Sequence, residues 1–145
     1  MAADLCEELG LELPCLPEEA KKELKAKLPP QCILGNPIDL TGDTDASRYE
    51  IAVRLIDASS AYDTYYLIFG DPIEKATEIV QTLRSDLKKP VIACYVGGGE
   101  IEIVERKKMN SAGIPVFPTP ERGIRAINVL TRYAKVLGHR GAGSA

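Results

Sequence analysis

Two glycine-bearing loops carry the residue types that bind anions most readily. One covers residues 35–44 (GNPIDLTGDT) and leads into a helical pattern; the other is the glycine triplet at 97–99, directly before another helical pattern. Glycine, asparagine and threonine supply hydrogen-bond donors, and a helix N-terminus adds partial positive charge. The pattern indicates a site for phosphate or another small anion. The candidate phosphate-binding residues are Asn36, Asp39, Thr41, Gly42, Asp43, Gly97, Gly98 and Gly99.

The same loops also have a purely structural interpretation. Residues 35–44 have the composition of an ordinary strand-to-helix turn, and three glycines equally make a flexible connector. Asp39 and Asp43 could form a metal or acid–base pair, although aspartates in such a loop are more often turn and cap residues. Neither a Walker-type nor a dinucleotide-binding fingerprint is present. We therefore assign no catalytic residue and no metal ligand.

The histidine and the cysteines do not indicate a catalytic or metal centre. His139 lies in a glycine-flanked stretch that superficially resembles a phosphohistidine loop, but its place after the last expected helix favours an unstructured tail. The four cysteines form no C-x-x-C pair, which argues against a zinc site. Cys32 and Cys94 sit in apolar runs, where cysteine behaves as a small hydrophobe, so a reducing compartment fits best.

The elements that must position these loops alternate between strand-like and helical patterns. Strong, continuously apolar strands are expected at 65–69 and 90–96, and weaker ones at 11–16 (an edge strand), 32–34 and 114–117. Helical patterns occupy the intervals. Their caps are Asp45 or Thr44 for the third helix and Thr119 for the last. This alternation predicts an α/β fold of three layers, a parallel sheet with helices on both faces.

Two helices have distinctive faces. The mixed charges at 102–108 predict a solvated face on the helix near 100–112. The last helix is expected to bury one apolar stripe, made of Ala126, Ile127, Leu130, Ala134 and Leu137. Residues 1–137 then form a single domain, and residues 138–145 form a Gly/Ala/Ser-rich tail, a linker or a frayed end.

The totals exclude several classes of protein. The chain has 145 residues and a net charge of −3, with 45% hydrophobic and 27% charged residues, as expected for one globular domain. That mild charge argues against a nucleic-acid or anionic-membrane partner. No apolar run approaches the roughly 20 residues that span a bilayer. The acidic, amphipathic start is unlike a signal peptide, so a cytoplasmic location is expected.

No strand pattern precedes the first helical pattern, whereas doubly wound domains usually begin with a strand that becomes central. Either the fold does without this strand or the chain is a shortened part of a larger unit. In a doubly wound sheet of order 2-1-3-4-5 the missing strand would lie between 11–16 and 32–34. We therefore expect self-association at the open edge, pairing with a partner subunit, or a loosened region over 2–16.

Several motifs, taken in order, resemble the NDP-forming acyl-CoA synthetases over about residues 2–134. They are residues 35–43 (GNPIDLTGD), Arg48-Tyr49, residues 89–94 (KPVIAC), Gly97-Gly98 and residues 112–122 (AGIPVFPTPER). The match is to the last flavodoxin-like subdomain of the α subunit of ADP-forming acetate–CoA ligases. The chain is also similar to the carboxyl-terminal domain of the succinyl-CoA synthetase β subunit.

This resemblance implies a function that requires other domains. In the family, a nucleotide phosphorylates a histidine, and the phosphate passes through an acyl phosphate to drive thioester formation with CoA. The resemblance implies that Gly42 and the helix after it help to cradle the phosphohistidine, while His139 does not match the family's histidine. ATP or ADP, Mg²⁺ and CoA are implied for the whole enzyme and none for this chain alone. The implied partners are CoA-binding and ATP-grasp domains or subunits.

The sequence thus predicts a phosphate-loop subdomain of an ADP-forming acid–CoA ligase, inactive by itself. The alternative is a non-catalytic module of the same fold that binds an anion or nucleotide or has a regulatory role. Neighbouring reading frames that encode ATP-grasp and CoA-binding domains would favour the first interpretation.

Overall fold

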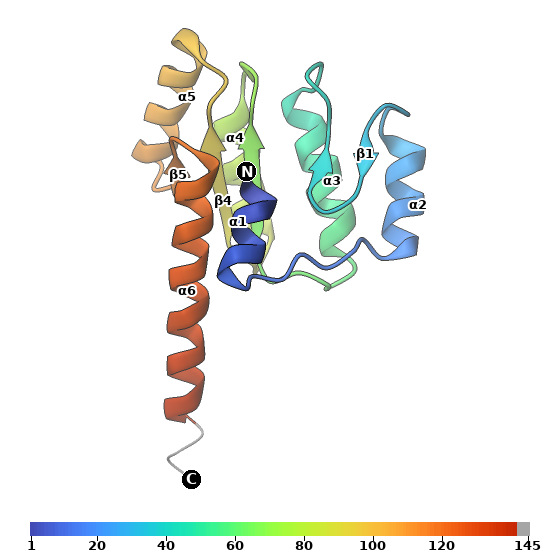
Figure 1. Ribbon diagram of the computed structural model, residues 1–145. Coiled ribbons are helices and arrows are strands. Elements are labelled where there is room, and N and C mark those ends of the chain that lie inside the picture. The colour runs from blue at the N-terminus through green and yellow to red at the C-terminus, as the bar shows by residue number, and fades with distance from the viewer. Residues whose placement is uncertain (142–145) are drawn as a thin grey trace.

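The computed structural model describes residues 1–141, with side chains described through Leu137. This part of the chain forms six helices and five strands, which alternate from α3 onward (Figure 1). The elements are α1 (Ala2–Leu9), α2 (Glu18–Lys27), β1 (Ile33–Leu34), β2 (Ile38–Asp39), α3 (Ala46–Asp57), β3 (Tyr65–Phe69), α4 (Ala76–Asp86), β4 (Val91–Tyr95), α5 (Gly99–Ser111), β5 (Val116–Phe117) and α6 (Pro120–Gly141). The expected α/β class is confirmed.

The centre of the fold is a parallel sheet in the order β3-β4-β5. Tyr65 of β3 lies opposite Val91 of β4, and Cys94 of β4 lies opposite Phe117 of β5. Every residue of β4 is buried, as expected for a central strand covered on both faces. The two strongest strands expected from the sequence are therefore the two longest strands of the sheet.

Helices cover both faces of this sheet. One face packs its alternate side chains, such as Leu67 and Phe69, against α4 and neighbouring helices through Val80 and Leu83. The other face receives α1 and the start of α6, which lie together on the same side of the sheet in Figure 1. The α6 backbone approaches the sheet so closely that a Cβ on Gly123 would lie 2.1 Å from the Tyr66 hydroxyl. These three layers agree with the sequence-based expectation.

The segment at 32–34 does not join the parallel sheet. Instead, β1 pairs with β2 as a separate antiparallel ribbon, with Ile33 opposite Asp39 and Leu34 opposite Ile38. The turn at 35–37 is short enough to return the chain directly, whereas a parallel pairing needs a crossover of a dozen or more residues. Leu40, just after β2, and Leu24 of α2 anchor a second apolar cluster beneath α3.

The expected edge strand at 11–16 is wrong, because this segment is extended but pairs with no strand. Two side chains occupy its carbonyl groups instead. Asn36 Nδ2 donates to the Pro14 carbonyl oxygen at 3.0 Å, and the Tyr62 hydroxyl donates to that of Cys15 at 3.2 Å. The alternating apolar pattern therefore belongs to a segment that side chains hold in place. Hydrogen bonds from Asn36 and Tyr62 take the place of those from a neighbouring strand.

Among the described residues, β3 is an edge strand of the parallel sheet. The backbone N–H and C=O groups of its odd-numbered residues point toward β4, since the Tyr65 N–H donates to the Pro90 carbonyl and the Phe69 carbonyl accepts from the Val96 N–H. The carbonyl of Ile68 points the other way and accepts a hydrogen bond from the Tyr49 hydroxyl of α3 at 2.8 Å. A side chain thus occupies one position of this edge. The open edge was expected between 11–16 and 32–34, but neither segment joins the parallel sheet. Self-association and pairing with a partner subunit stay predictions.

The buried stripe expected on α6 is wrong over its second half. Ile124 is buried against α1, but Leu130 and Leu137 are about half exposed, and Ala134 is exposed as well. The reason is length. Eight residues of α1 span about 12 Å, whereas the 22 residues of α6 span about 33 Å, so α6 extends past the end of the sheet (Figure 1).

The end of α6 also differs from expectation. The helix continues through Gly141 rather than ending near Leu137, so the backbone at His139 is helical and not an unstructured tail. A single glycine costs a helix only about 1 kcal/mol, which does not stop a helix that is already propagating. Residues 142–145 of the expected tail lie outside the described residues. None of the helices in residues 1–141 combines the length and apolar composition needed to cross a bilayer.

Candidate functional site

Three loops meet at the edge of the molecule where the parallel strands end. They are residues 40–45 before α3, residues 70–75 after β3 and residues 96–98 after β4, and all three lie at the top of Figure 1. Asp71 of the middle loop links the other two. A Cβ added to Gly42 would lie 3.6 Å from the Asp71 carboxylate oxygen Oδ2. A Cβ added to Gly97 would lie 2.3 Å from the Asp71 backbone carbonyl carbon. The structure therefore brings Gly42 and Gly97 to the same place from opposite sides of one loop.

Gly97 permits this convergence because it has no side chain. A Cβ there would overlap the Asp71 carbonyl and also lie 2.8 Å from the Pro72 nitrogen. The middle loop is held from below by Tyr95, the last residue of β4. Its hydroxyl accepts from the Ile73 N–H at 2.6 Å and donates to the Ile73 carbonyl at 2.8 Å. A fully buried tyrosine thus fixes the loop against which the glycine packs.

The loop before α3 is occupied by its own polar groups. Asp39 accepts the Thr41 N–H at 2.8 Å, and the Thr41 hydroxyl donates to Asp43. Asp43 also forms a two-pronged ion pair with Arg48, at 3.1 and 3.3 Å. Hydrogen bonds from Arg48 and from Thr41 lower the pKa of Asp43 to about 2. Asp39 and Asp43 thus act in this structure as turn and ion-pair residues.

The N-terminus of α3 carries a carboxylate of the chain itself. Asp45 is the N-cap residue, one of the two expected from the sequence, and accepts from the Arg48 N–H at 3.0 Å and the Ser47 hydroxyl at 2.7 Å. These hydrogen bonds, from Ser47 first, lower the pKa of Asp45. An external anion at this helix terminus would compete with a charge that is already in place.

The loop before α5 is more open. Gly98 and Gly99 have φ angles of 77° and 73°, a left-handed conformation that glycine adopts without strain, and no atom lies within 4 Å of either Cβ position. The Gly98 N–H donates to Glu102 Oε2 at 2.8 Å. No side chain caps this helix from its N-cap position. The first-turn N–H groups of α5 therefore face an exposed edge.

Two of the residues expected in the site have different surroundings from those expected. Asn36 lies in the β1–β2 turn and donates to Pro14, so it does not join Gly42 and Gly97. At Gly42 the backbone is not in the left-handed region; its neighbour Thr41 is, with a φ of 68°. The glycine at position 42 therefore provides space beside Asp71 rather than an unusual backbone angle.

The sequence pattern gave no sign of the buried, structural role of Glu105. It was expected on a solvated face, but it is 3% exposed. Its carboxylate accepts from the Thr77 N–H at 2.8 Å and the Thr77 hydroxyl at 2.7 Å, at the start of α4, and from Lys108 Nζ at 2.7 Å. Burial alone would raise the pKa of Glu105, but the hydrogen bonds from Lys108 and Thr77 outweigh burial and lower it. Glu105 thus caps α4 from a neighbouring helix.

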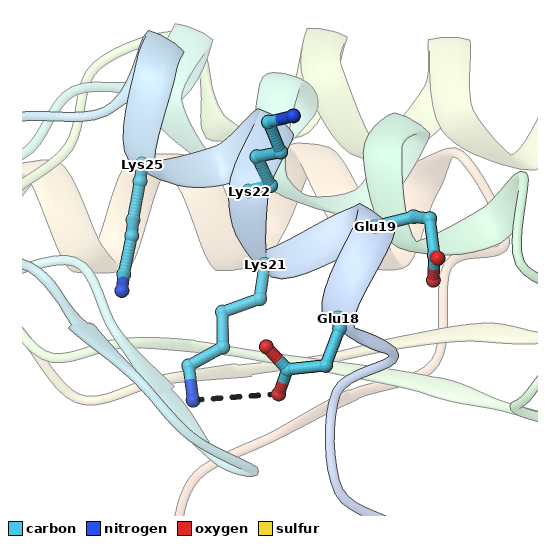
Figure 2. Close-up of a pocket in the computed structure, with 5 residues that line it drawn as sticks. All are labelled: Glu18, Glu19, Lys21, Lys22 and Lys25. Carbon is cyan, nitrogen blue, oxygen red and sulfur yellow. Dashed lines mark ion pairs between the residues drawn. The ribbon is translucent and has the colours of Figure 1, made fainter.

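No group of three or more histidine, cysteine, aspartate or glutamate side chains is placed to hold a metal ion within the described residues. A shallow hollow lies elsewhere, on the exposed face of α2 (Figure 2). There Glu18 pairs with Lys21 at 3.9 Å, while Glu19, Lys22 and Lys25 point in different directions. Side chains that diverge in this way form a solvated helix surface and not a binding site.

Comparison with known proteins identifies the family. A family model described as the Ligase-CoA domain matches residues 1–141. The chain belongs to the Ligase-CoA domain family. The family resemblance seen in the sequence is therefore confirmed.

Related proteins are larger than this Ligase-CoA domain. ADP-forming acetate–CoA ligase I of Archaeoglobus fulgidus is 32% identical over 136 residues, which cover 94% of this chain and 19% of that protein. The α subunit of ADP-forming acetate–CoA ligase I of Pyrococcus furiosus is 37% identical over 142 residues, covering 93% of this chain and 30% of that subunit. The chain thus spans less than a third of either relative.

Solved structures agree with this assignment. The apo form of dinucleotide forming acetyl-coenzyme A synthetase 1 from Candidatus Korarchaeum cryptofilum superposes with a TM-score of 0.83 at 26% identity, covering 99% of this chain and 32% of that one. A second structure of the same enzyme, in complex with phosphate and ADP, superposes equally well. The Ligase-CoA domain therefore has the fold of one portion of such an enzyme.

Proposed function

We propose that this chain is a phosphate-handling part of an ADP-forming acid–CoA ligase, an enzyme that interconverts acid, CoA and ATP with acyl-CoA, ADP and phosphate. The observation that carries this proposal is the family match over residues 1–141, together with the meeting of two glycine loops around Asp71. The relatives are ADP-forming acetate–CoA ligases, and one solved relative binds phosphate and ADP. The other domains or subunits of the enzyme are its partners.

Within this proposal, the loop before α5 offers the most accessible donors. Gly98 and Gly99 are exposed, and the helix that follows contributes its partial positive charge. The loop before α3 contributes space beside Gly42, but its charges are already paired within the chain. We therefore infer that a phosphate group held on another domain approaches from the α5 side, with Gly42 and Thr41 lining the opposite wall.

His139 receives no catalytic role in this proposal. The helix α6 begins on the side of the loops and runs away from them (Figure 1), and position 139 belongs to its last turn. The phosphorylated histidine of the complete enzyme would then come from a different domain. The described residues also do not fit a magnesium site, so no step through a metal is assigned to this chain.

Phosphate binding provides the direct test of the site. We expect inorganic phosphate to shift the backbone amide resonances of Gly98, Gly99 and Gly42 in a titration followed by NMR. Replacing Gly42 with valine should weaken this binding, because a branched side chain fills the space beside Asp71. Gly70 is the matched control, since no atom lies within 4 Å of its Cβ position. Equal phosphate affinity in Gly42→Val and wild type would count against the cradle.

Activity measurements test the second half of the proposal. We expect no ADP release from the pure chain supplied with acetate, CoA and ATP, because the nucleotide and CoA domains are contributed by partners. Release that depends on both CoA and acid, above a blank, would overturn this view. A chain that binds phosphate or ADP but restores no activity when combined with CoA-binding and ATP-grasp partners would instead be the non-catalytic module of the same fold.

A further inference from the structure

The second half of α6 presents an apolar stripe to solvent. Its members are between 48% and 64% exposed, in contrast to the buried residues of the same helix nearer the sheet. The stripe consists of Val129, Leu130, Tyr133, Val136 and Leu137. Large apolar side chains that are exposed singly need no explanation, but a contiguous group on one helix marks an interaction surface.

The spacing shows that the stripe is a separate face and not the margin of the domain's own core. Its members follow one another at i, i+1, i+4, i+7 and i+8, the repeat of one side of a helix. At about 100° per residue, the centre of the stripe lies roughly 150° around α6 from Ile124 and Ile127, which pack with α1. The helix therefore uses one side for its own domain and turns another apolar side outward.

The charges beside the stripe are basic. Arg125 and Arg132 are both exposed and stand seven residues apart, so they lie along the same border of the stripe, next to Val129 and Val136. No acidic residue occurs between Arg122 and Leu137. A partner that covered the stripe would place its own flanking side chains against this basic border.

Antiparallel self-pairing is disfavoured by the same charges. If two copies of α6 paired antiparallel through their stripes, the arginine-bearing border of one copy would lie beside the same border of the other. Like charges placed so close are destabilising. An apolar helix with carboxylates along its edge matches both the stripe and the border.

We propose that the outward stripe of α6 is a docking site for an acidic amphipathic helix of another polypeptide. This inference goes beyond the proposed ligase function and does not depend on it, because the stripe lies on the part of α6 that extends away from the three loops (Figure 1). The partner's apolar residues pack on Leu130, Tyr133 and Leu137, and its carboxylates pair with Arg125 and Arg132.

The test uses two labelled synthetic helices of about 20 residues, identical except for their charges, a length at which isolated helices become stable. Both carry leucines at heptad spacing, one with glutamates and one with lysines on its flanks. We expect the full chain to bind the glutamate peptide at least about tenfold more tightly than the lysine peptide in fluorescence anisotropy. Leu130→Ser should weaken this binding about tenfold, and the double variant R125E/R132E should reverse the charge preference.

Ile103 of α5 supplies the matched control. It is 68% exposed, so Ile103→Ser removes a similarly exposed apolar side chain from a different helix and should leave binding unchanged. Circular dichroism establishes that each variant is folded. Equal affinity for the two peptides, or no binding of either, would overturn the proposal. So would a dimer in light scattering that Leu130→Ser abolishes, or a preference for phosphatidylglycerol vesicles over the glutamate peptide.

Discussion

The N-termini of α3 and α5 lie at the same edge of the molecule but differ in what occupies them. The terminus of α3 holds Asp45, a carboxylate that satisfies the first N–H groups of the helix. The terminus of α5 has two left-handed glycines and no cap from the side chain of its N-cap residue, and there the Glu102 carboxylate accepts from the Gly98 N–H. Glycine-bearing loops that look equivalent in sequence thus differ in how the chain's own carboxylates occupy the helix that follows.

The terminus of α4 extends the comparison. It too is filled by a carboxylate, but this one comes from Glu105 on the neighbouring helix. All three termini therefore have a carboxylate of the chain at or beside them, and at α5 the Glu102 carboxylate accepts from the N–H of the N-cap residue Gly98. The termini therefore differ in how many of their N–H groups a carboxylate of the chain occupies, and we expect substitutions at these positions to differ in effect accordingly.

The largest effect is expected at Gly97. Replacing it with alanine places a Cβ within 2.3 Å of the Asp71 backbone, which cannot yield without moving the middle loop. We expect Gly97→Ala to lower the free energy of unfolding by about 3 kcal/mol in urea denaturation. Gly70→Ala is the control, because its Cβ meets no atom within 4 Å. Similar stabilities of the two variants would show that the loops do not pack as described.

Removing the buried carboxylate should have the next largest effect. Glu105→Leu leaves the Thr77 N–H and Lys108 without their acceptor, so we expect a loss of about 2 kcal/mol of stability. Glu100→Ala, on the exposed face of the same helix, is the control.

The pH dependence of Glu105 follows from its lowered pKa. A lowered pKa means that the charged form stabilises the fold above the unfolded-state value, about 4.3, and that this contribution disappears as the pH falls through the folded-state value. Wild type should therefore lose stability in acid more steeply than Glu105→Leu. Parallel curves of unfolding free energy against pH would contradict the assignment of the cap to a charged Glu105.

A smaller effect is expected at the α3 terminus. Asp45→Ala removes the side-chain cap and should cost about 1 kcal/mol, while Asp45→Asn should retain most of the stability. Added sulfate should then recover part of the loss in Asp45→Ala, because the vacated terminus accepts an external anion. Thermal unfolding with and without sulfate measures this recovery. Equal stabilisation of wild type and Asp45→Ala by sulfate would show that Asp45 does not keep anions away from the N-terminus of α3.

The smallest effect on stability concerns the exposed pair of Asp43 and Arg48. The pair is best detected by titrating Asp43. Carboxyl NMR should find the pKa of Asp43 near 2 in wild type and closer to its ordinary value in Arg48→Met. Because the pKa is lowered, any contribution of this pair is present above the ordinary pKa and is lost as the pH falls toward 2. An unchanged Asp43 titration in Arg48→Met would show that the pair does not hold the loop.

Local pattern was enough to predict the two longest strands and two of the helix caps. The continuous apolar runs became β3 and β4, and Asp45 and Thr119 cap their helices, with the Thr119 hydroxyl accepting from the Arg122 N–H at 3.4 Å. Such features depend on a few neighbouring residues, whose propensities act wherever the segment lies. The order of motifs likewise carried the family resemblance, which the Ligase-CoA match confirms.

Where neighbours in space decided the outcome, the sequence was not sufficient. The segment at 11–16 alternates as a strand does, yet it has no partner strand, and Glu105 belongs to a charged run but is buried against α4. Leu130, Ala134 and Leu137 of α6 have the spacing of a buried face, but α1 is too short to cover them. Periodicity shows which side chains share a face. Only the lengths and packing of the elements opposite determine whether that face is covered.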